Sequence, residues 1–209
     1  SVNYDFLSVL LTLSMTFCQF ITTLDNISHI EYNMTYVNKG HCMTKATTIR
    51  QDYQLVNAKY KLSTTEIKFI LLSLTQIKKE DTEFQEYEIK VSDLEERLGA
   101  EQNETRLKQF AKKMMSKPLE VPTGDGWIIA NWFADVEYIR GQAKFTVSFS
   151  KKLKPYLLDL QERFVHYNLR YILPLTSAYA IRIYQMLKEY EKLKIRYIKV
   201  DELMEILQV

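Results

Sequence analysis

Residues 92–150 constrain the fold more than any other part of the chain. The stretches SDLEERLG (92–99) and NETRLKQFAKKMMSKP (103–118) are both predicted to be helical. Gly99 is placed to end the first helix, and Pro118 stops the second. Two short helices joined by a tight turn that contains glycine are typical of a helix-turn-helix.

The stretch GWIIANWFADVEYIRGQAKFTVSFS (126–150), which follows these helices, is rich in residues that favour strands. Two β-rich runs flank Arg140-Gly141-Gln142, and this tripeptide suits a hairpin turn. Helix, helix and hairpin in this order are typical of a winged helix. We therefore predict an α+β fold in which helices pack on a small antiparallel sheet with a β-hairpin wing.

Further elements are predicted before this region. Residues 55–60 can form a short helix, and the stretch STTEIKFILLSLTQI (63–77) has a clear helix start. Ser63 can cap that helix, and Glu66, three residues on, can reciprocate. The buried stripe of this helix is expected to comprise Ile67, Ile70, Leu71 and Leu74. The alternating stretch YEIKV (87–91) is predicted to be a strand.

The part of the chain after the wing is predicted to be mostly helical. SKKLKPYLLDL (150–160) is expected to be helical, FVHYNLRYILPL (164–175) extended, and DELMEILQV (201–209) a last helix. Between them, SAYAIRIYQMLKEY (177–190) is strongly amphipathic, and we expect its tyrosines and leucines to pack in the core. Its apolar side carries Tyr179, Ala180, Ile183, Tyr184, Leu187 and Tyr190. Its polar side carries Arg182, Gln185, Lys188 and Glu189, with Lys192 beyond its end.

Residues 1–42 differ from the rest of the chain. They hold three acidic residues, one basic residue and both cysteines, and residues 6–24 are uncharged. A membrane helix needs roughly 20 mainly apolar residues, so this run is near the limit. Three interpretations stay open: a membrane or signal segment, an ordered helix packed on the domain or a partner, and an extension that precedes the domain. The absence of cysteine after residue 42 fits a cytoplasmic protein without a disulfide framework.

Motifs for catalysis or cofactor binding are missing from the sequence. It contains no glycine-rich phosphate loop, no H-E-x-x-H motif and no paired cysteines with zinc-ligand spacing. The three histidines, His29, His41 and His166, are scattered. We therefore expect a protein that is not an enzyme, with no cofactor, no metal and no small-molecule substrate.

Basic side chains cluster around the predicted helix-turn-helix and wing. The formal net charge of +2 does not decide whether the protein binds nucleic acid, because a local patch decides that question. A lysine-rich helix face can also be simply solvated, and that alternative stays open. If the domain touches DNA, we expect contacts to the phosphate backbone from Arg106, Lys108, Lys112, Lys113, Lys117, Arg140, Lys144, Lys151 and Lys152.

Three stretches resemble the replication initiator (Rep) proteins of iteron-containing bacterial plasmids. They are LVNAKYKLSTTEIKFILLSL (55–74), FVHYNLRYILPLTSAYAIRIYQMLKEY (164–190) and IRYIKVDELMEIL (195–207). Their order and spacing are similar to those of the family's first winged-helix domain. The resemblance covers roughly residues 50–209 and does not extend to the residues before them.

The resemblance implies a function in plasmid replication. It implies that the protein binds double-stranded DNA at origin iterons, forms homodimers that repress its own gene, and recruits the host initiator and replicative helicase. The domain division that follows is a 1–42 extension, which the family does not predict, and a 43–209 winged-helix domain. The family's second winged-helix domain would begin where this chain ends. Two alternatives stay open: a winged-helix transcription regulator, and an interaction protein anchored in a membrane through residues 6–24.

Overall fold

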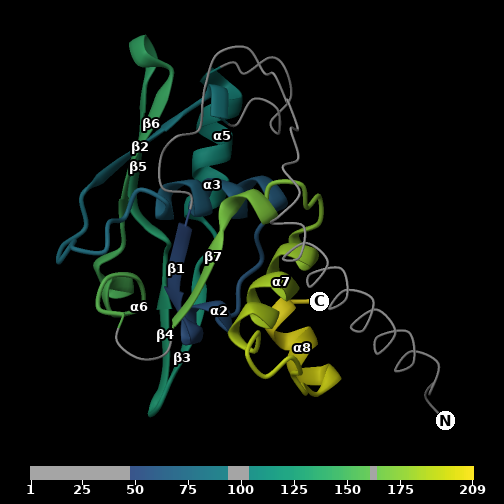
Figure 1. Ribbon diagram of the computed structural model, residues 1–209. Coiled ribbons are helices and arrows are strands. Elements are labelled where there is room, and N and C mark those ends of the chain that lie inside the picture. Colours follow the sequence, from purple (N-terminus) through teal and green to yellow (C-terminus); the bar gives the residue numbers. More distant parts are fainter. Residues whose placement is uncertain (1–47, 94–103, 161–163) are drawn as a thin grey trace, which may run out of the picture. The chain divides into compact units, whose positions relative to one another are not determined.

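The computed structural model describes residues 48–93, 104–160 and 164–209, which form helices packed against small antiparallel sheets (Figure 1). The α+β winged helix predicted from the sequence is confirmed. Residues 1–47 and 94–103 lie outside the described residues, so the three interpretations of the first 42 residues stay predictions. The same holds for most of the first helix of the predicted helix-turn-helix.

The wing is a three-stranded sheet in the order β2-β6-β5. Its strands are β2 (Glu86–Lys90), β5 (Phe133–Ile139) and β6 (Lys144–Phe149). A 3-10 turn, η2 (Arg140–Gln142), joins β5 to β6, and Ala143 closes it with a φ of 46°. The hairpin predicted around these residues is therefore confirmed.

Two further strand pairs lie outside the wing. β1 (Thr48–Asp52) pairs with β7 (Phe164–Asn168), and β3 (Leu119–Thr123) pairs with β4 (Gly126–Ala130). The second pair was not predicted, because Pro122 weakens the strand signal of β3. Residues 126–130 had been assigned to the wing hairpin, and they belong instead to this separate hairpin.

Most helices begin and end close to the predicted positions, but residues 169–171, predicted to be extended, form a 3-10 turn. α3 (Thr64–Leu74) has the predicted capping box between Ser63 and Glu66. α2 is shorter and earlier than expected, because Asp52 caps it by accepting a hydrogen bond from the backbone N–H of Gln54. The other helical elements are α2 (Tyr53–Val56), α5 (Glu104–Met115), η3 (Lys151–Leu153), α6 (Lys154–Leu157), η4 (Leu169–Tyr171), α7 (Ala178–Glu189) and α8 (Val200–Leu207).

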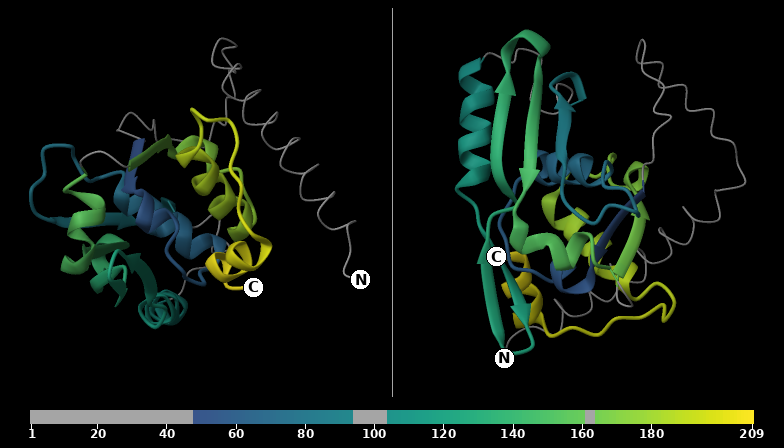
Figure 2. Two further views of the ribbon diagram at one scale, coloured as in Figure 1. Left: turned by 90° about the horizontal axis from the view of Figure 1, so that it is seen from below. Right: turned by 90° about the vertical axis from the view of Figure 1, so that its left-hand side faces the viewer.

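Aromatic side chains join α3, α5 and the inner face of the wing. The ring of Phe69 on α3 lies 5.4 Å from that of Phe110 on α5, 5.7 Å from that of Phe133 and 5.5 Å from that of Phe145. Edge-to-face ring pairs at such distances add to the stabilisation that burial gives. This cluster fixes α5 beside the wing strands, as the right-hand view of Figure 2 shows.

The polar side of α7 is where the sequence prediction was wrong. Arg182 and Gln185 were placed on the side away from the core, yet both are almost fully buried. The Arg182 guanidinium donates to the Tyr60 hydroxyl and to the Ala58 carbonyl, each at 2.6 Å. The stripe of buried residues is therefore rotated relative to the predicted one, and Tyr179 is 44% exposed. The physical reason is that hydrogen-bond partners in the folded structure offset the cost of removing polar groups from water.

Candidate nucleic-acid interface

Helix α5 presents a basic face to solvent from a firmly packed position. Leu107 and Met114 are buried, and Phe110 packs on the aromatic cluster. The helix lies beside β5, and its opposite face points away from that strand (Figures 1 and 2). Lys108 and Lys112 lie on that face, Arg106 and Lys113 lie at its border, and all four side chains are exposed.

Lys108 is near Glu104 and helps Arg140 to lower the pKa of that carboxyl, whereas Lys112 and Lys113 have no such partner among the described residues. Lys108, Lys112 and Lys113 form no ion pair with residues in the ranges 48–93, 104–160 and 164–209. Lys108 and Lys112 are one helical turn apart and share a face. Three exposed ammonium groups on a rigid helix are suited to bind phosphate oxygens.

Lys117 is held in a different environment. Its ammonium group bonds both carboxylate oxygens of Glu66, at 2.6 and 2.9 Å, and Glu66 is 1% exposed. Burial by itself would raise the pKa of the Glu66 carboxyl, but the hydrogen bonds from Lys117 and from the Ser63 backbone outweigh it. The pKa of Glu66 is therefore lowered. Lys117 thus has a structural partner in the core, unlike the lysines before it on α5.

The two wing residues are also in ion pairs. Arg140 pairs with Glu104 at the start of α5, which connects the wing tip to that helix. The hydrogen bond from Arg140 lowers the pKa of Glu104. Lys144 pairs with Glu88 across the sheet and its side chain is 16% exposed. Both positive charges are thus partly compensated.

Lys151 and Lys152 lie apart from the other predicted residues. Both are exposed in η3, after the end of β6, whereas Arg140 and Lys144 lie at its start. A strand of six residues is about 20 Å long, so the two groups occupy opposite ends of the wing. The structure therefore brings together Arg140 and the α5 residues and leaves Lys151 and Lys152 as a second, smaller basic patch.

A second surface, on β4, was not singled out from the sequence. Trp127 is 64% exposed and Ile129 57% exposed, on the face of the β3–β4 hairpin away from Leu119 and Val121. The sequence signal is faint, because GWIIA is apolar on both sides and does not tell which side is buried. We call Trp127 and Ile129 the β4 surface.

The described residues contain neither a cluster of metal ligands nor a helix that could span a membrane. Within them, no three His, Cys, Asp or Glu side chains gather in a way that could hold a metal ion. None of the helices formed by these residues has the length and apolar composition needed to cross a bilayer. The stretch 6–24 lies outside this part of the chain.

Comparison with known proteins supports the same type of domain. A protein family described as initiator replication protein, WH1, matches residues 48–188. The crystal structure of the Pi initiator protein in complex with iteron DNA is similar, with 19% sequence identity and a TM-score of 0.57. The match covers 78% of this chain and 73% of that chain. At this identity the match supports the fold alone.

A second solved structure is the WH1 domain of a replication protein isolated from a multiple sclerosis patient. It is 13% identical, with a TM-score of 0.34, and the match covers 63% of this chain and 86% of that chain. This similarity is too low to support a structural argument.

Proposed function

The chain belongs to the initiator replication protein family, with its WH1 domain at residues 48–188, and from this premise we propose that it acts in plasmid replication initiation by binding DNA. The resemblance identified in its three sequence stretches is thereby confirmed. The structural match to the Pi initiator, whose crystal structure contains iteron DNA, supports double-stranded iteron DNA as the ligand class. The proposed role is binding and assembly, without catalysis or a cofactor.

The exposed basic face of α5 is the observation that carries the proposal. Lys108, Lys112 and Lys113 project from a helix whose other side is locked into the aromatic core. We propose that these lysines and Arg106 contact the DNA backbone. Arg140, Lys144 and Lys117 have carboxylate partners and would contribute less, and Lys151 and Lys152 would form a separate contact.

Charge reversal tests this assignment. The variant Lys108→Glu/Lys112→Glu/Lys113→Glu is compared with Lys192→Glu/Lys194→Glu/Lys199→Glu, which makes the same charge change at exposed positions near α8. Binding to a fluorescein-labelled mixed-sequence DNA duplex is followed by anisotropy over a range of salt concentrations. We expect the α5 variant to lose more than about tenfold in affinity. The slope of log affinity against log salt should fall by about 3, because each phosphate contact contributes about 0.9.

Equal losses in the two variants would contradict the assignment to α5. A loss of affinity that does not depend on salt would contradict phosphate contacts as its cause. A transcription regulator would share the fold and the basic helix. Footprinting separates the two functions, since an initiator protects tandem repeats at an origin and a regulator protects one operator.

We also propose that the chain forms a homodimer through the β4 surface. β4 is hydrogen-bonded only to β3 among the described strands, and its outer face presents Trp127 and Ile129 to solvent. Exposed aromatic and aliphatic side chains on such a face are typical of protein interfaces. The proposal extends to function: dimers repress the initiator's own gene, and monomers bind iterons and recruit host replication proteins.

Sedimentation equilibrium of the 209-residue chain tests the dimer. Trp127→Ser/Ile129→Ser should shift the protein towards monomer at micromolar concentration. The control is Leu193→Ser/Tyr197→Ser, which removes apolar groups that are even more exposed, after α7. Loss of the dimer in the control alone would place the interface there instead.

The domain division is also a proposal. We assign residues 43–209 to the winged-helix domain and residues 1–42 to a separate extension. Limited proteolysis should leave a stable fragment that begins near residue 43, and a first stable cut inside the domain would contradict this division.

A further inference from the structure

The outer face of the wing sheet carries an ordered arrangement of acids. In an antiparallel sheet, side chains of directly paired residues point to the same face. Ser148 on β6 is paired with Glu86 on β2 and with Asp135 on β5. Two residues along, Thr146 is paired with Glu88 and with Glu137. The face therefore has two rows, and in each row a residue with a hydroxyl group lies between two acidic residues.

The charge of these rows is only partly compensated. Lys144 pairs with Glu88, and the Ser148 hydroxyl donates to Asp135 at 3.1 Å. Glu86 and Glu137 are exposed and form no ion pair with residues 48–93, 104–160 or 164–209. Carboxylates on both sides of a central strand repel each other, which costs stability unless a cation comes between them.

The hydroxyl of Thr146 lies at the centre of this arrangement. Thr146 is 8% exposed, and its Oγ1 atom has no hydrogen-bond partner among the described residues. By register, it points to the same face as Glu88 and Glu137 and lies between them. A buried hydroxyl without a partner costs free energy, so a hydrogen-bond donor that reaches Thr146 removes this cost.

Three classes of ligand can be compared. DNA is disfavoured because its phosphates would be repelled by the carboxylates. A metal ion is disfavoured because no three acidic side chains among the described residues converge on one point. A segment of a protein with lysine or arginine side chains matches both the charge and the hydroxyl acceptors.

The β2 edge of the sheet is partly blocked, because the backbone groups of Glu88 are already hydrogen-bonded. The Gln76 side chain donates to the carbonyl of Glu88 at 2.8 Å and accepts from its backbone N–H at 3.3 Å. These bonds occupy groups of edge strand β2 that an added strand would need. On the β2 side, a partner would therefore lie across the side chains and would not extend the sheet.

We propose that the outer face of the wing sheet binds an extended segment of a partner protein that has arginine or lysine at alternate positions. Alternate residues of an extended chain are about 7 Å apart, which is also the spacing of Glu86 from Glu88 along β2. A cationic group between Glu88 and Glu137 lies over Thr146, beside Lys144, and reaches the buried hydroxyl once the flanking side chains move aside. This surface is separate from α5, so the proposal does not depend on DNA binding.

The test uses two labelled peptides of identical composition and the 209-residue chain. One peptide alternates arginine and serine, and the other has all arginines first and all serines last. Fluorescence anisotropy should give a several-fold higher affinity for the alternating peptide. Glu86→Gln/Glu137→Gln should weaken its binding by about tenfold or more, as expected for lost charge-assisted hydrogen bonds. Asp201→Asn/Glu202→Gln on α8 is the matched control and should bind as the unchanged chain does.

The variant Thr146→Val tests the contribution of the hydroxyl group to peptide binding. It should weaken binding of the alternating peptide several-fold while the melting temperature stays the same or rises, because an unpaired buried hydroxyl is removed. Equal affinity of the two peptides, or equal binding by the two double variants, would overturn the proposal. Duplex binding by Glu86→Gln/Glu137→Gln is measured in parallel, so that failure here is distinguished from failure of the DNA assignment.

Discussion

At the scale of single residues, Glu66 connects local structure to tertiary structure. As part of the α3 capping box, it accepts a hydrogen bond from the backbone N–H of Ser63 at 2.6 Å. The same carboxylate receives the ammonium group of Lys117, which follows α5. A carboxylate that is 1% exposed keeps its charge only because both partners are present.

We expect Lys117→Met to destabilise the protein by about 3 kcal/mol at neutral pH, because it leaves a buried charge without its counter-ion. The lowered pKa of Glu66 means that its ionised form stabilises the fold above the ordinary carboxyl pKa, and that this contribution is lost as pH falls through the folded-state value. Urea denaturation at several pH values should therefore show the difference between the two proteins shrinking on acidification.

Lys113→Met is the control for this prediction. Lys113 is exposed on the same helix, and its loss should change the free energy of unfolding by no more than about 0.5 kcal/mol. If Lys113→Met and Lys117→Met cost the same at every pH, the Glu66–Lys117 pair does not stabilise the core.

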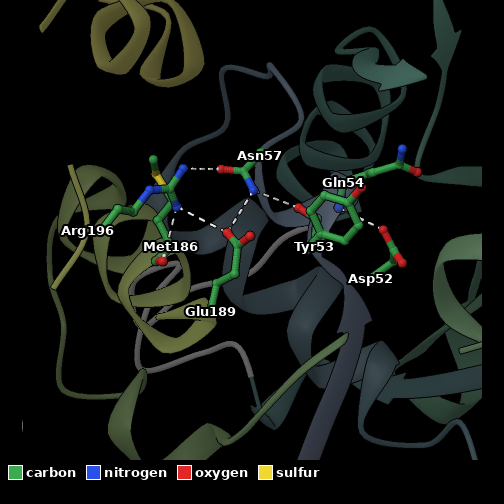
Figure 3. A network of polar contacts seen from close by, with 7 residues as sticks. All are labelled: Asp52, Tyr53, Gln54, Asn57, Met186, Glu189 and Arg196. Atoms are coloured by element: carbon green, nitrogen blue, oxygen red, sulfur yellow. Dashed lines mark hydrogen bonds and ion pairs between the residues drawn. The ribbon is translucent and has the colours of Figure 1, made fainter. Parts of the chain in front are cut away.

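At the scale of elements, Arg196 holds the segment between α7 and α8 in place through hydrogen bonds. The Arg196 guanidinium donates to the Met186 carbonyl at 3.1 Å, to Glu189 at 3.2 Å and to the Asn57 side chain at 2.7 Å (Figure 3). Asn57 in turn donates to Glu189 and to the carbonyl of Tyr53 in α2. The ends of α2 and α7 and the segment before α8 are therefore held by one network.

We expect Arg196→Ala to loosen α8 without unfolding the domain. The variant removes three hydrogen bonds that hold residues 190–199 in place, whereas Ile206 and the Lys59–Glu205 pair still anchor α8. Hydrogen exchange should accelerate about tenfold or more in residues 200–207 and stay unchanged in the wing. Lys194→Ala, at an exposed position nearby, should leave exchange unchanged, and equal acceleration in both variants would contradict the role of Arg196.

Elements with local signals were the ones that could be predicted from the sequence. The capping box of α3, the wing hairpin and the existence of α7 depend on residues a few positions apart, and all three are confirmed. The burial of Arg182 could not be predicted, because its partners Tyr60 and Ala58 are more than 120 residues away in the chain. The β3–β4 hairpin was missed because Pro122 obscures its pattern.

The candidate DNA-binding site could also be predicted only in part: its positions on one helix, but not its tertiary ion pairs. The sequence placed Arg106, Lys108, Lys112 and Lys113 on one helix, and the structure has them there. It could not show that Lys117 and Lys144 are paired with Glu66 and Glu88, because each pair joins elements separated by about 50 residues. Whether a lysine is available to a ligand depends on such tertiary pairing and not on its spacing.

At the scale of the whole domain, opposite charges lie on different surfaces of the wing region. Basic side chains project from α5, and acidic rows cover the outer face of the sheet whose inner face packs on Phe69. A sheet and the layer packed on it are about 10 Å apart. The Debye length is about 8 Å at 0.15 M salt and about 30 Å at 0.01 M. The acids therefore influence DNA bound at α5 only when salt is low.

We expect the salt concentration to decide the effect of Glu86→Gln/Glu137→Gln on DNA binding. At 0.01 M salt the variant should bind a DNA duplex about two- to threefold more tightly, because the repulsion of phosphates by two carboxylates is removed. At 0.15 M salt its affinity should match that of the unchanged chain. Anisotropy titrations at both concentrations check this, with Asp201→Asn/Glu202→Gln as the control for net charge. A large change at 0.15 M would mean that the outer face itself contacts DNA, which would contradict both the assignment of DNA to α5 and the assignment of a basic protein segment to the sheet.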